Sequence, residues 1–394
     1  MNWKSILVEQ SAWSKDNAAE LRMSPEDAVT LYDHAPLHEL MTAAHQRRTA
    51  MHGPNRVTYL VDRNINYTNV CTINCQFCSF YRPPGHEETY TQTFEEISGR
   101  ISALEEIGGS RILMQGGVNP DLPFEWYEDL LRHISTNHPT IAIDCFSPIE
   151  IEGIAEVSNQ TTLQVLTRLK AAGMHGLPGG GAEMLVDDVR KDVSPKKGLP
   201  ANWLRVMEEA QSLHLTTSAT NVIGFGESNA QRVEHMRRVR NLQDQSLKDN
   251  EIGFTSFIAW PVQLESNTFG RRNSGSNRVT LGAGSSEYLR HVAMSRLFLD
   301  SIPNIQSSWP TMGIKTAQMA LFGGANDVGS TMMEENVVSA SGTTKFSASE
   351  KELQHVIQRA GFAPQRRDSN YVLLETQLIV PDHADVPAPI PLQG

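Results

Sequence analysis

Hydrophobic residues follow two spacings along the chain, one typical of buried strands and one typical of amphipathic helices. Short apolar runs such as RVTYLVDR (56–63) and RILMQGG (111–117) predict strands. Longer segments with an apolar residue every three or four positions, such as FEEISGRISALEEIG (94–108), predict helices between them. The other predicted strands are IAIDCFS (141–147), GMHGLPG (173–179), TTSATNVIG (216–224), GFTSFIAW (253–260), NIQSSW (304–309) and MALFGG (319–324).

Strands that alternate with helices predict a parallel sheet with right-handed crossovers. Eight such units fit a closed (β/α)8 TIM-type barrel better than an open doubly wound sheet. We therefore expect an α/β protein with a barrel over 56–335. An N-terminal helical extension (1–55) should precede it, and a small C-terminal α/β segment (336–380) should pack on it. The Pro- and Ala-rich stretch 381–394 predicts a flexible tail.

Charge and hydropathy restrict the partners of this protein. The 394 residues carry 34 basic and 45 acidic side chains, a formal net charge of -11. Without a block of Lys or Arg, the sequence predicts no nucleic-acid partner. No apolar run is long enough for a membrane span, and the N-terminus does not resemble a signal peptide. We expect a soluble cytoplasmic protein with no membrane partner.

Three of the four cysteines lie close together just after the first predicted strand. Cys71, Cys75 and Cys78 have the spacing CxxxCxxC within NINYTNVCTINCQFCSFYR. Three thiolates on one loop can hold three irons of a 4Fe-4S cluster and leave the fourth iron open to the amino and carboxylate groups of a methionine moiety. Enzymes with this fold place their chemistry at the carboxyl ends of the strands, where this loop should lie.

Two structural interpretations of the cysteines stay open. The first is a zinc knuckle, which normally requires four ligands and for which His86 is the nearby fourth candidate. The second is a set of small buried side chains, and this is our interpretation of Cys145, which lies within an apolar strand.

Other motifs that end strands predict further walls of the same site. Gly116 and Gly117 leave room for a ligand amino group, although a Gly pair is often only a turn. Ser147 and Glu150 follow the third strand. Glu183, after three glycines, is suited to binding both hydroxyls of a ribose, or is equally a helix N-terminal acid stabilised by the dipole.

The end of the fifth strand and the cysteine loop suggest contacts to an adenine. Backbone groups of Ile223, Gly224 and Gly226 in NVIGFGE are suited to hydrogen-bonding its edge. Phe77, next to Cys78, is suited to packing on the adenine or to shielding the cluster.

In this order, the motifs resemble those of the radical S-adenosylmethionine (SAM) superfamily. The segments NINYTNVC, QGGVNPDLP, PGGGAEMLVDDVR, SPKK and FGGANDVGSTMMEENVV resemble its futalosine branch in menaquinone biosynthesis, and most closely the dehypoxanthine futalosine cyclases. The resemblance extends from about Leu37 to Tyr371. Aminofutalosine synthases and deazaflavin-chromophore synthases share the cluster loop and remain alternatives, as does, more distantly, a zinc-stabilised barrel without radical chemistry.

The resemblance implies a specific reaction. One 4Fe-4S cluster and SAM would generate a 5′-deoxyadenosyl radical that removes the ribose 4′ hydrogen of dehypoxanthine futalosine. The sugar radical would attack the benzoate ring and lose an electron and a proton, giving cyclic dehypoxanthine futalosine. A one-electron donor such as a flavodoxin or ferredoxin is implied as a partner.

The resemblance also implies roles for individual residues. Cys71, Cys75 and Cys78 would ligate the cluster, Gln115 to Gly117 and more weakly Ser147 would meet the methionine end of SAM, and Glu183 its ribose. The catalytic base has no candidate. Lys315 and Arg190 are possible cations for the substrate carboxylate, with solvated surface as the default for each. Trp309 is equally a core aromatic. The expected substrate contacts are Glu150, Gln306, Ser308, Trp309, Asn326 and Glu335.

Overall fold

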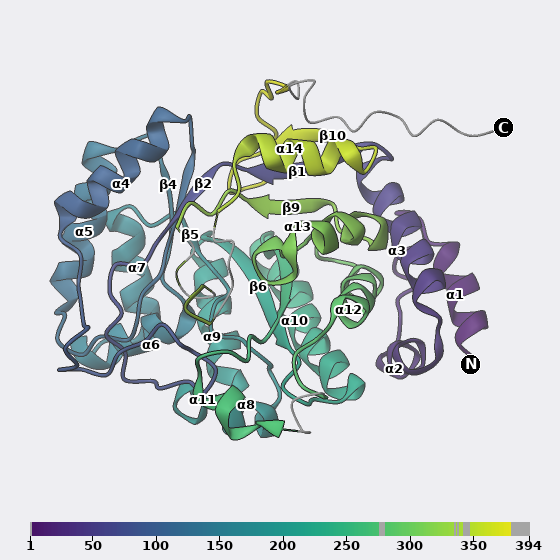
Figure 1. The fold of residues 1–394 in the computed structure, drawn as a ribbon, viewed down its shortest axis with the longest axis horizontal. Helices are drawn as coiled ribbons and strands as arrows, with labels where there is room; N and C mark the ends of the chain where they lie inside the picture. Colours follow the sequence, from purple (N-terminus) through teal and green to yellow (C-terminus); the bar gives the residue numbers. More distant parts are fainter. Residues whose placement is uncertain (1, 276–279, 335, 337–338, 342–346, 380–394) are drawn as a thin grey trace.

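A sheet of ten parallel strands forms the centre of the protein in the computed structural model, which describes residues 2–275, 280–334, 336, 339–341 and 347–379 (Figure 1). The strand order is β10-β1-β9-β8-β7-β6-β5-β4-β3-β2. The strands are β1 (Arg56–Leu60), β2 (Asp62–Ile65), β3 (Arg111–Met114), β4 (Ala142–Cys145), β5 (Gly176–Leu177), β6 (Thr216–Ile223), β7 (Phe254–Pro261), β8 (Asn304–Gln306), β9 (Asp327–Ser330) and β10 (Ala363–Arg366).

The two ends of this sheet meet within one stretch of chain. Only Val61 separates β1, which pairs with β9 and β10, from β2, which pairs with β3. The backbone N–H of Asn64 also donates to the carbonyl of Met333, 3.2 Å away, just beyond β9. The sheet therefore curls into a TIM-like barrel, which confirms the predicted fold class.

Helices lie outside the barrel and bury one face each against it. In α4, for example, Ile97, Ile101 and Leu104 are fully buried, and a capping box at Thr93 begins the helix. The helices after β2 are α4 (Phe94–Glu106), α5 (Phe124–Asn137), α6 (Pro148–Ser158), α7 (Thr162–Ala172), α8 (Asp187–Val193), α9 (Pro200–Ser212), α10 (Asn229–Asn250), α11 (Thr268–Arg272), α12 (Ser285–Phe298), α13 (Trp309–Ala320) and α14 (Glu350–Arg359).

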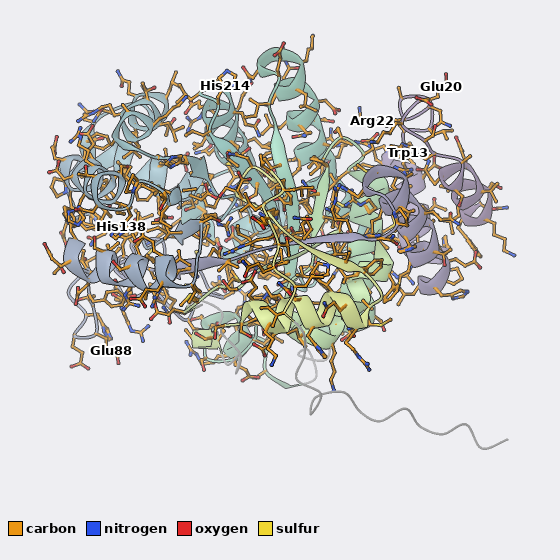
Figure 2. All side chains as sticks on the ribbon, turned by 90° about the horizontal axis from the view of Figure 1, so that it is seen from above. Trp13, Glu20, Arg22, Glu88, His138 and His214 are labelled. Atoms are coloured by element: carbon orange, nitrogen blue, oxygen red, sulfur yellow. The ribbon has the colours of Figure 1, made fainter. Side chains whose placement is uncertain are left out.

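Three helices precede the barrel and pack on its flank: α1 (Trp3–Ser11), α2 (Pro25–His34) and α3 (Leu37–His52). Helix α3 lies against α12, and its buried Arg48 donates to the carbonyls of Ala325 (3.1 Å) and Arg56 (2.7 Å). Trp13 stacks on the Arg47 guanidinium at 4.3 Å. Figure 2 shows Trp13 on the opposite side of the molecule from His138. The N-terminal helices are thus tied to the barrel through buried guanidinium groups.

The last predicted barrel strand is wrong in position. Residues 319–324 end α13 and form a 3-10 turn, η3 (Leu321–Gly323), and the strand is β9 instead. The apolar run is helical, with Ala320 and Leu321 buried and Met319 and Phe322 exposed, and Gly324 ends it with a φ of 106°. Strand β9 has no apolar pattern in its sequence. It can bury Asp327 because Arg367 neutralises the carboxylate, with the Arg367 Nε 2.5 Å from Asp327 Oδ2.

The chain after α14 returns to the barrel and closes its amino-terminal end. Strand β10 pairs with β1 on the sheet edge, and Arg367 then enters to meet Asp327. Ser369 donates to Asp144 Oδ2 at 2.8 Å. The predicted tail 381–394 lies outside the described residues. Within the described part of the chain, no helix is both long enough and apolar enough to cross a membrane.

Candidate active site

A cavity of about 390 Å³ extends from the cysteine loop into the barrel. It lies at the carboxyl ends of the strands, the end where barrel enzymes act. Most of the residues predicted from the sequence line it together. These are Cys71, Cys75, Phe77, Cys78, Gln115, Gly116, Gly117, Ser147, Glu150, Glu183, Gln306, Ser308 and Trp309.

The cysteine loop follows β2 and is fixed by backbone hydrogen bonds to distant segments. The N–H of Cys71 donates to the carbonyl of Arg82 (2.9 Å), and that of Gln76 to Val193 (3.0 Å). All four cysteines are free thiols. Burial raises the pKa of Cys75 to about 11, and the nearby Lys197 ammonium opposes this rise. A compensating positive charge, such as iron, therefore favours deprotonation of the Cys75 thiol.

Glu183 is held beside the cysteines by a lysine that the sequence reasoning did not single out. Lys197 donates to Glu183 Oε1, and both side chains are nearly buried. The other oxygen, Oε2, has no hydrogen-bond partner among the described residues, and Arg190 Nη1 lies 3.6 Å from it. Lys197 belongs to the SPKK motif, so that motif was the available signal. Lys197 thus fixes one oxygen of Glu183, and the other is a buried acceptor that makes no hydrogen bond and has Arg190 as an ionic neighbour.

The Gly116–Gly117 turn passes very close to the cysteine loop. A Cβ atom on Gly117 would lie 2.1 Å from the Val70 carbonyl oxygen and 2.7 Å from Cys71 Cβ. A Cβ atom on Gly116 would lie 2.7 Å from the ring of Tyr67. Both positions thus exclude a side chain, and the turn presents bare backbone beside the cysteines.

These residues fit an iron-sulfur cluster with a bound SAM. Three free thiols form a soft donor set, the glycine turn offers backbone to an amino acid, and Glu183 keeps an unpartnered buried oxygen for a sugar hydroxyl. The described residues include no group of three His, Cys, Asp or Glu side chains placed to hold a single metal ion. His86, the proposed fourth zinc ligand, uses Nδ1 to accept the N–H of Glu88.

Several predicted contacts lie elsewhere. Ile223, Gly224 and Gly226 do not line the cavity, whereas Val222 does. The N–H of Gly224 donates to Glu227 Oε1 (2.9 Å) and its carbonyl accepts from Gly282 (2.8 Å), so this backbone is already paired. Their assignment to the cofactor is not supported by this placement.

The predicted substrate contacts divide in the same way. Asn326 precedes β9 at the opposite end of the barrel, where its Oδ1 accepts from the N–H of Ile305 at 3.0 Å, so the structure places it away from the cavity and the other expected substrate contacts. Trp309 lines the cavity but is buried, and its Nε1 donates to the Ser330 carbonyl (3.0 Å), as expected of a core aromatic. Glu335 lies outside the described residues.

The two cations suggested for the substrate are placed outside the cavity. Lys315 is exposed on α13. Arg190 is buried, and its Nη1 donates to the carbonyls of Gly181 (2.8 Å) and Ala182 (2.9 Å). The cations that line the cavity are Arg111, Lys197 and Arg367.

Arg111 belongs to an ionic layer at the deep end of the cavity that sequence reasoning missed. Its Nε donates to Asp62 Oδ2 (3.1 Å), and its Nη1 lies 3.4 Å from Asp144 Oδ2. Burial raises the pKa of Asp144, and Arg111 opposes the rise. The sequence did contain a signal for this layer, because each of the first three predicted strands carries one of these charged residues: Asp62, Arg111 and Asp144.

Comparison with known proteins agrees with this geometry. Residues 65–239 match the model of the radical SAM superfamily, and residues 251–379 match that of the CofH/MqnC C-terminal region. A cyclic dehypoxanthine futalosine synthase from Halalkalibacterium halodurans is 44% identical over 90% of this chain and 92% of its own length. The chain belongs to the radical SAM superfamily.

A further relative and a solved structure are also similar to this radical SAM protein. An aminodeoxyfutalosine synthase from Thermus thermophilus is 33% identical over 89% of this chain and 92% of its own. The FeFe-hydrogenase maturase HydG from Carboxydothermus hydrogenoformans has the same fold, with a TM-score of 0.68 at 17% identity, covering 93% of this chain and 81% of that one. The resemblance expected from the sequence is confirmed, and the radical SAM family implies a 4Fe-4S cluster and SAM for a protein with these three cysteines.

Proposed function

We propose that this radical SAM enzyme cyclises dehypoxanthine futalosine to cyclic dehypoxanthine futalosine, a step of menaquinone biosynthesis. The observation that carries the proposal is that one cavity brings together three features. These are the three-cysteine loop, the bare glycine turn and the buried Glu183 carboxylate, one oxygen of which makes no hydrogen bond. The 44% identity to a cyclic dehypoxanthine futalosine synthase over nine-tenths of the chain supports this substrate.

Each residue has a defined task in this proposal. When bound, the cluster and SAM supply a 5′-deoxyadenosyl radical that takes a hydrogen atom from the substrate ribose. Cys71, Cys75 and Cys78 hold the cluster at the mouth of the cavity. Glu183 orients the cofactor ribose through Oε2, while Lys197 fixes Oε1. Such positioning matters because a primary carbon radical reacts with whichever group is nearest.

The cavity walls supply the substrate site. Gln306 and Ser308, at the end of β8, face the same space as Gln115 and contact the substrate in this proposal. Trp309 closes the wall behind them and excludes water. A one-electron donor such as a flavodoxin or ferredoxin is required to reduce the cluster.

The test is incubation of anaerobically reconstituted, chemically reduced enzyme with SAM and dehypoxanthine futalosine. We expect 5′-deoxyadenosine together with a product two hydrogens lighter than the substrate, detected by mass spectrometry. Changing Cys71, Cys75 and Cys78 to Ala should abolish both, whereas the buried Cys145→Ala on β4 should retain both. Deoxyadenosine without consumption of this substrate would refute the cyclase assignment.

A second candidate follows from the aminodeoxyfutalosine synthase relative. That reaction adds a radical to a second substrate instead of closing a ring. A parallel incubation with the substrate of that enzyme separates the two, because only one of the substrates should be consumed.

A further inference from the structure

Glu150 is a buried carboxylate that the sequence assigned to the substrate, but its contacts lie elsewhere. It is 4% exposed and lies at the third position of α6. Its Oε1 accepts from the Tyr67 hydroxyl (2.8 Å) and from the backbone N–H of Gly116 (2.9 Å). Its Oε2 accepts from the Ser147 hydroxyl (2.7 Å). All three donors lie just after a barrel strand: Tyr67 after β2, Gly116 after β3 and Ser147 after β4.

This arrangement differs from ordinary helix capping. In a capping box, a carboxylate at this position reaches back to the backbone N–H of the N-cap residue, which here is Ser147. The Glu150 carboxylate instead extends across the cavity wall to the glycine turn after β3. Stabilisation of α6 alone does not require that contact.

The peptide between Gln115 and Gly116 is held from both sides. Its carbonyl, on Gln115, accepts from Asn66 Nδ2 at 3.0 Å, and its N–H, on Gly116, donates to Glu150. Because the carbonyl and N–H of a trans peptide point in opposite directions, two fixed partners determine the plane of this peptide. The ring of Tyr67 lies under Gly116 and blocks any side chain there.

We propose that Glu150 is a positioning residue that fixes the glycine turn so that its backbone binds the amino acid end of SAM. The inference rests on the proposed use of SAM in this cavity and is independent of the substrate that the radical attacks. Asn66, Tyr67 and Glu150 act as one clamp: NINY supplies the first two residues, SPIE supplies the third, and QGG is the turn that they hold.

The electrostatics of the clamp agree with this role. Burial raises the pKa of Glu150 to about 7, and the hydrogen bonds from Ser147, Gly116 and Tyr67 oppose the rise. An ionised Glu150 therefore gains from a nearby cation, and a methionine ammonium at the glycine turn supplies one. The same carboxylate thus orients the turn and favours the charge of the group that the turn binds.

The experiment measures SAM binding by equilibrium dialysis to reconstituted enzyme and by the change that SAM causes in the electron paramagnetic resonance spectrum of the reduced cluster. Glu150→Ala should weaken SAM binding about ten-fold or more, because it removes a charged acceptor from a backbone donor. Its iron and sulfide content should stay at the wild-type level. Glu150→Gln, which keeps an acceptor oxygen, should restore most of the affinity.

The matched control is Glu128→Ala on α5. Glu128 is a similarly buried carboxylate that accepts from Arg168 at 2.7 Å, outside the cavity. The Glu128→Ala variant should melt at a lower temperature than the wild type, with unchanged SAM affinity and an unchanged electron paramagnetic resonance spectrum. Tyr67→Phe, which removes one donor to Glu150, should weaken SAM binding less than Glu150→Ala does.

Wild-type affinity in Glu150→Ala, or equal losses in Glu128→Ala and Glu150→Ala, would overturn the inference. Absence of SAM binding in the wild type would overturn it together with the proposed function. If SAM binding to the enzyme depends on Glu150 but the wild type leaves dehypoxanthine futalosine unchanged, the inference stands and the cyclase assignment fails.

Discussion

The buried ion pair between Lys197 and Glu183 provides a quantitative test of the site. Lys197→Met removes the ammonium and keeps a side chain of similar bulk. The two side chains are 11% and 5% exposed, so the change leaves Glu183 with a buried charge. Breaking a buried pair by removing one partner costs about 3–5 kcal/mol. Arg190, 3.6 Å from Oε2, compensates in part, so we expect about 3 kcal/mol.

This free energy converts to a measurable shift in melting temperature. An unfolding entropy of about 2.1 cal/mol/K per residue gives roughly 0.8 kcal/mol/K for 394 residues. The variant should therefore melt about 4 °C below the wild type. The assay is thermal unfolding of the cluster-free, reduced chain, followed by circular dichroism.

A double-mutant cycle isolates the pair from other effects. Glu183→Gln removes the charge of the partner, so the double variant should lose less stability than the sum of the two single variants. Strictly additive losses, or a wild-type melting temperature for Lys197→Met, would refute the coupling of these two residues.

Three further changes test other parts of the structure. Gly117→Ala should lower the iron and sulfide bound on reconstitution, because its Cβ meets Val70 and Cys71, while Gly99→Ala on α4, with no atom within 4 Å of its Cβ, should bind the wild-type amounts. Arg367→Met should cost about 3–5 kcal/mol of unfolding free energy in denaturant titrations by leaving buried Asp327 unpaired; an unchanged midpoint would contradict this. Burial lowers the pKa of His235 to about 3, so the unfolded chain binds this proton as the pH falls below about 6.5 while the folded chain does not. The melting temperature should fall as the pH drops below about 6.5. It should fall less in His235→Asn, which keeps an acceptor for the N–H of Leu185. Parallel pH profiles of the two proteins would contradict this role of His235.

The fold was predictable where a strand carries an apolar run or several β-branched residues, even when it also buries a charged side chain, and it failed at β9, which has only one such residue. Strand β7 (FTSFIAWP) is largely apolar and strand β6 (TTSATNVI) is rich in β-branched residues, and the sequence located both to within a residue or two. Strand β9 buries Asp327 and Ser330, whose partners lie far along the chain. The local hydrophobic pattern therefore predicted the strand in the apolar segment before it, which is helical.

That one displacement also explains why Asn326 was expected in the site. A strand at 319–324 would have put Asn326 at its carboxyl end, in the active site. Because β9 starts at Asp327, Asn326 lies instead at the amino end.

Most residues expected on the cofactor side line the cavity because they lie in short motifs directly after strands, whereas Ile223, Gly224 and Gly226 do not. The cysteines, the glycine pair and Glu183 all line one cavity, as expected. The partners that hold them were not predictable, because Lys197 and Tyr67 reach them only through tertiary contacts. Spacing along a chain reveals which groups can bind a ligand together, but not which buried neighbours set their charge and orientation.

The division of the first barrel strand at Val61 has a consequence for biosynthesis of the enzyme. The cysteine loop leaves β2, while β1, one residue earlier, is held by β9 some 270 residues later in the chain. During translation, β1 therefore lacks β9, and β2 lacks its bridge to Met333, until the ribosome has released these residues. Closure of the barrel, and with it formation of the cavity that the cysteine loop lines, is thus tied to synthesis of nearly the whole polypeptide.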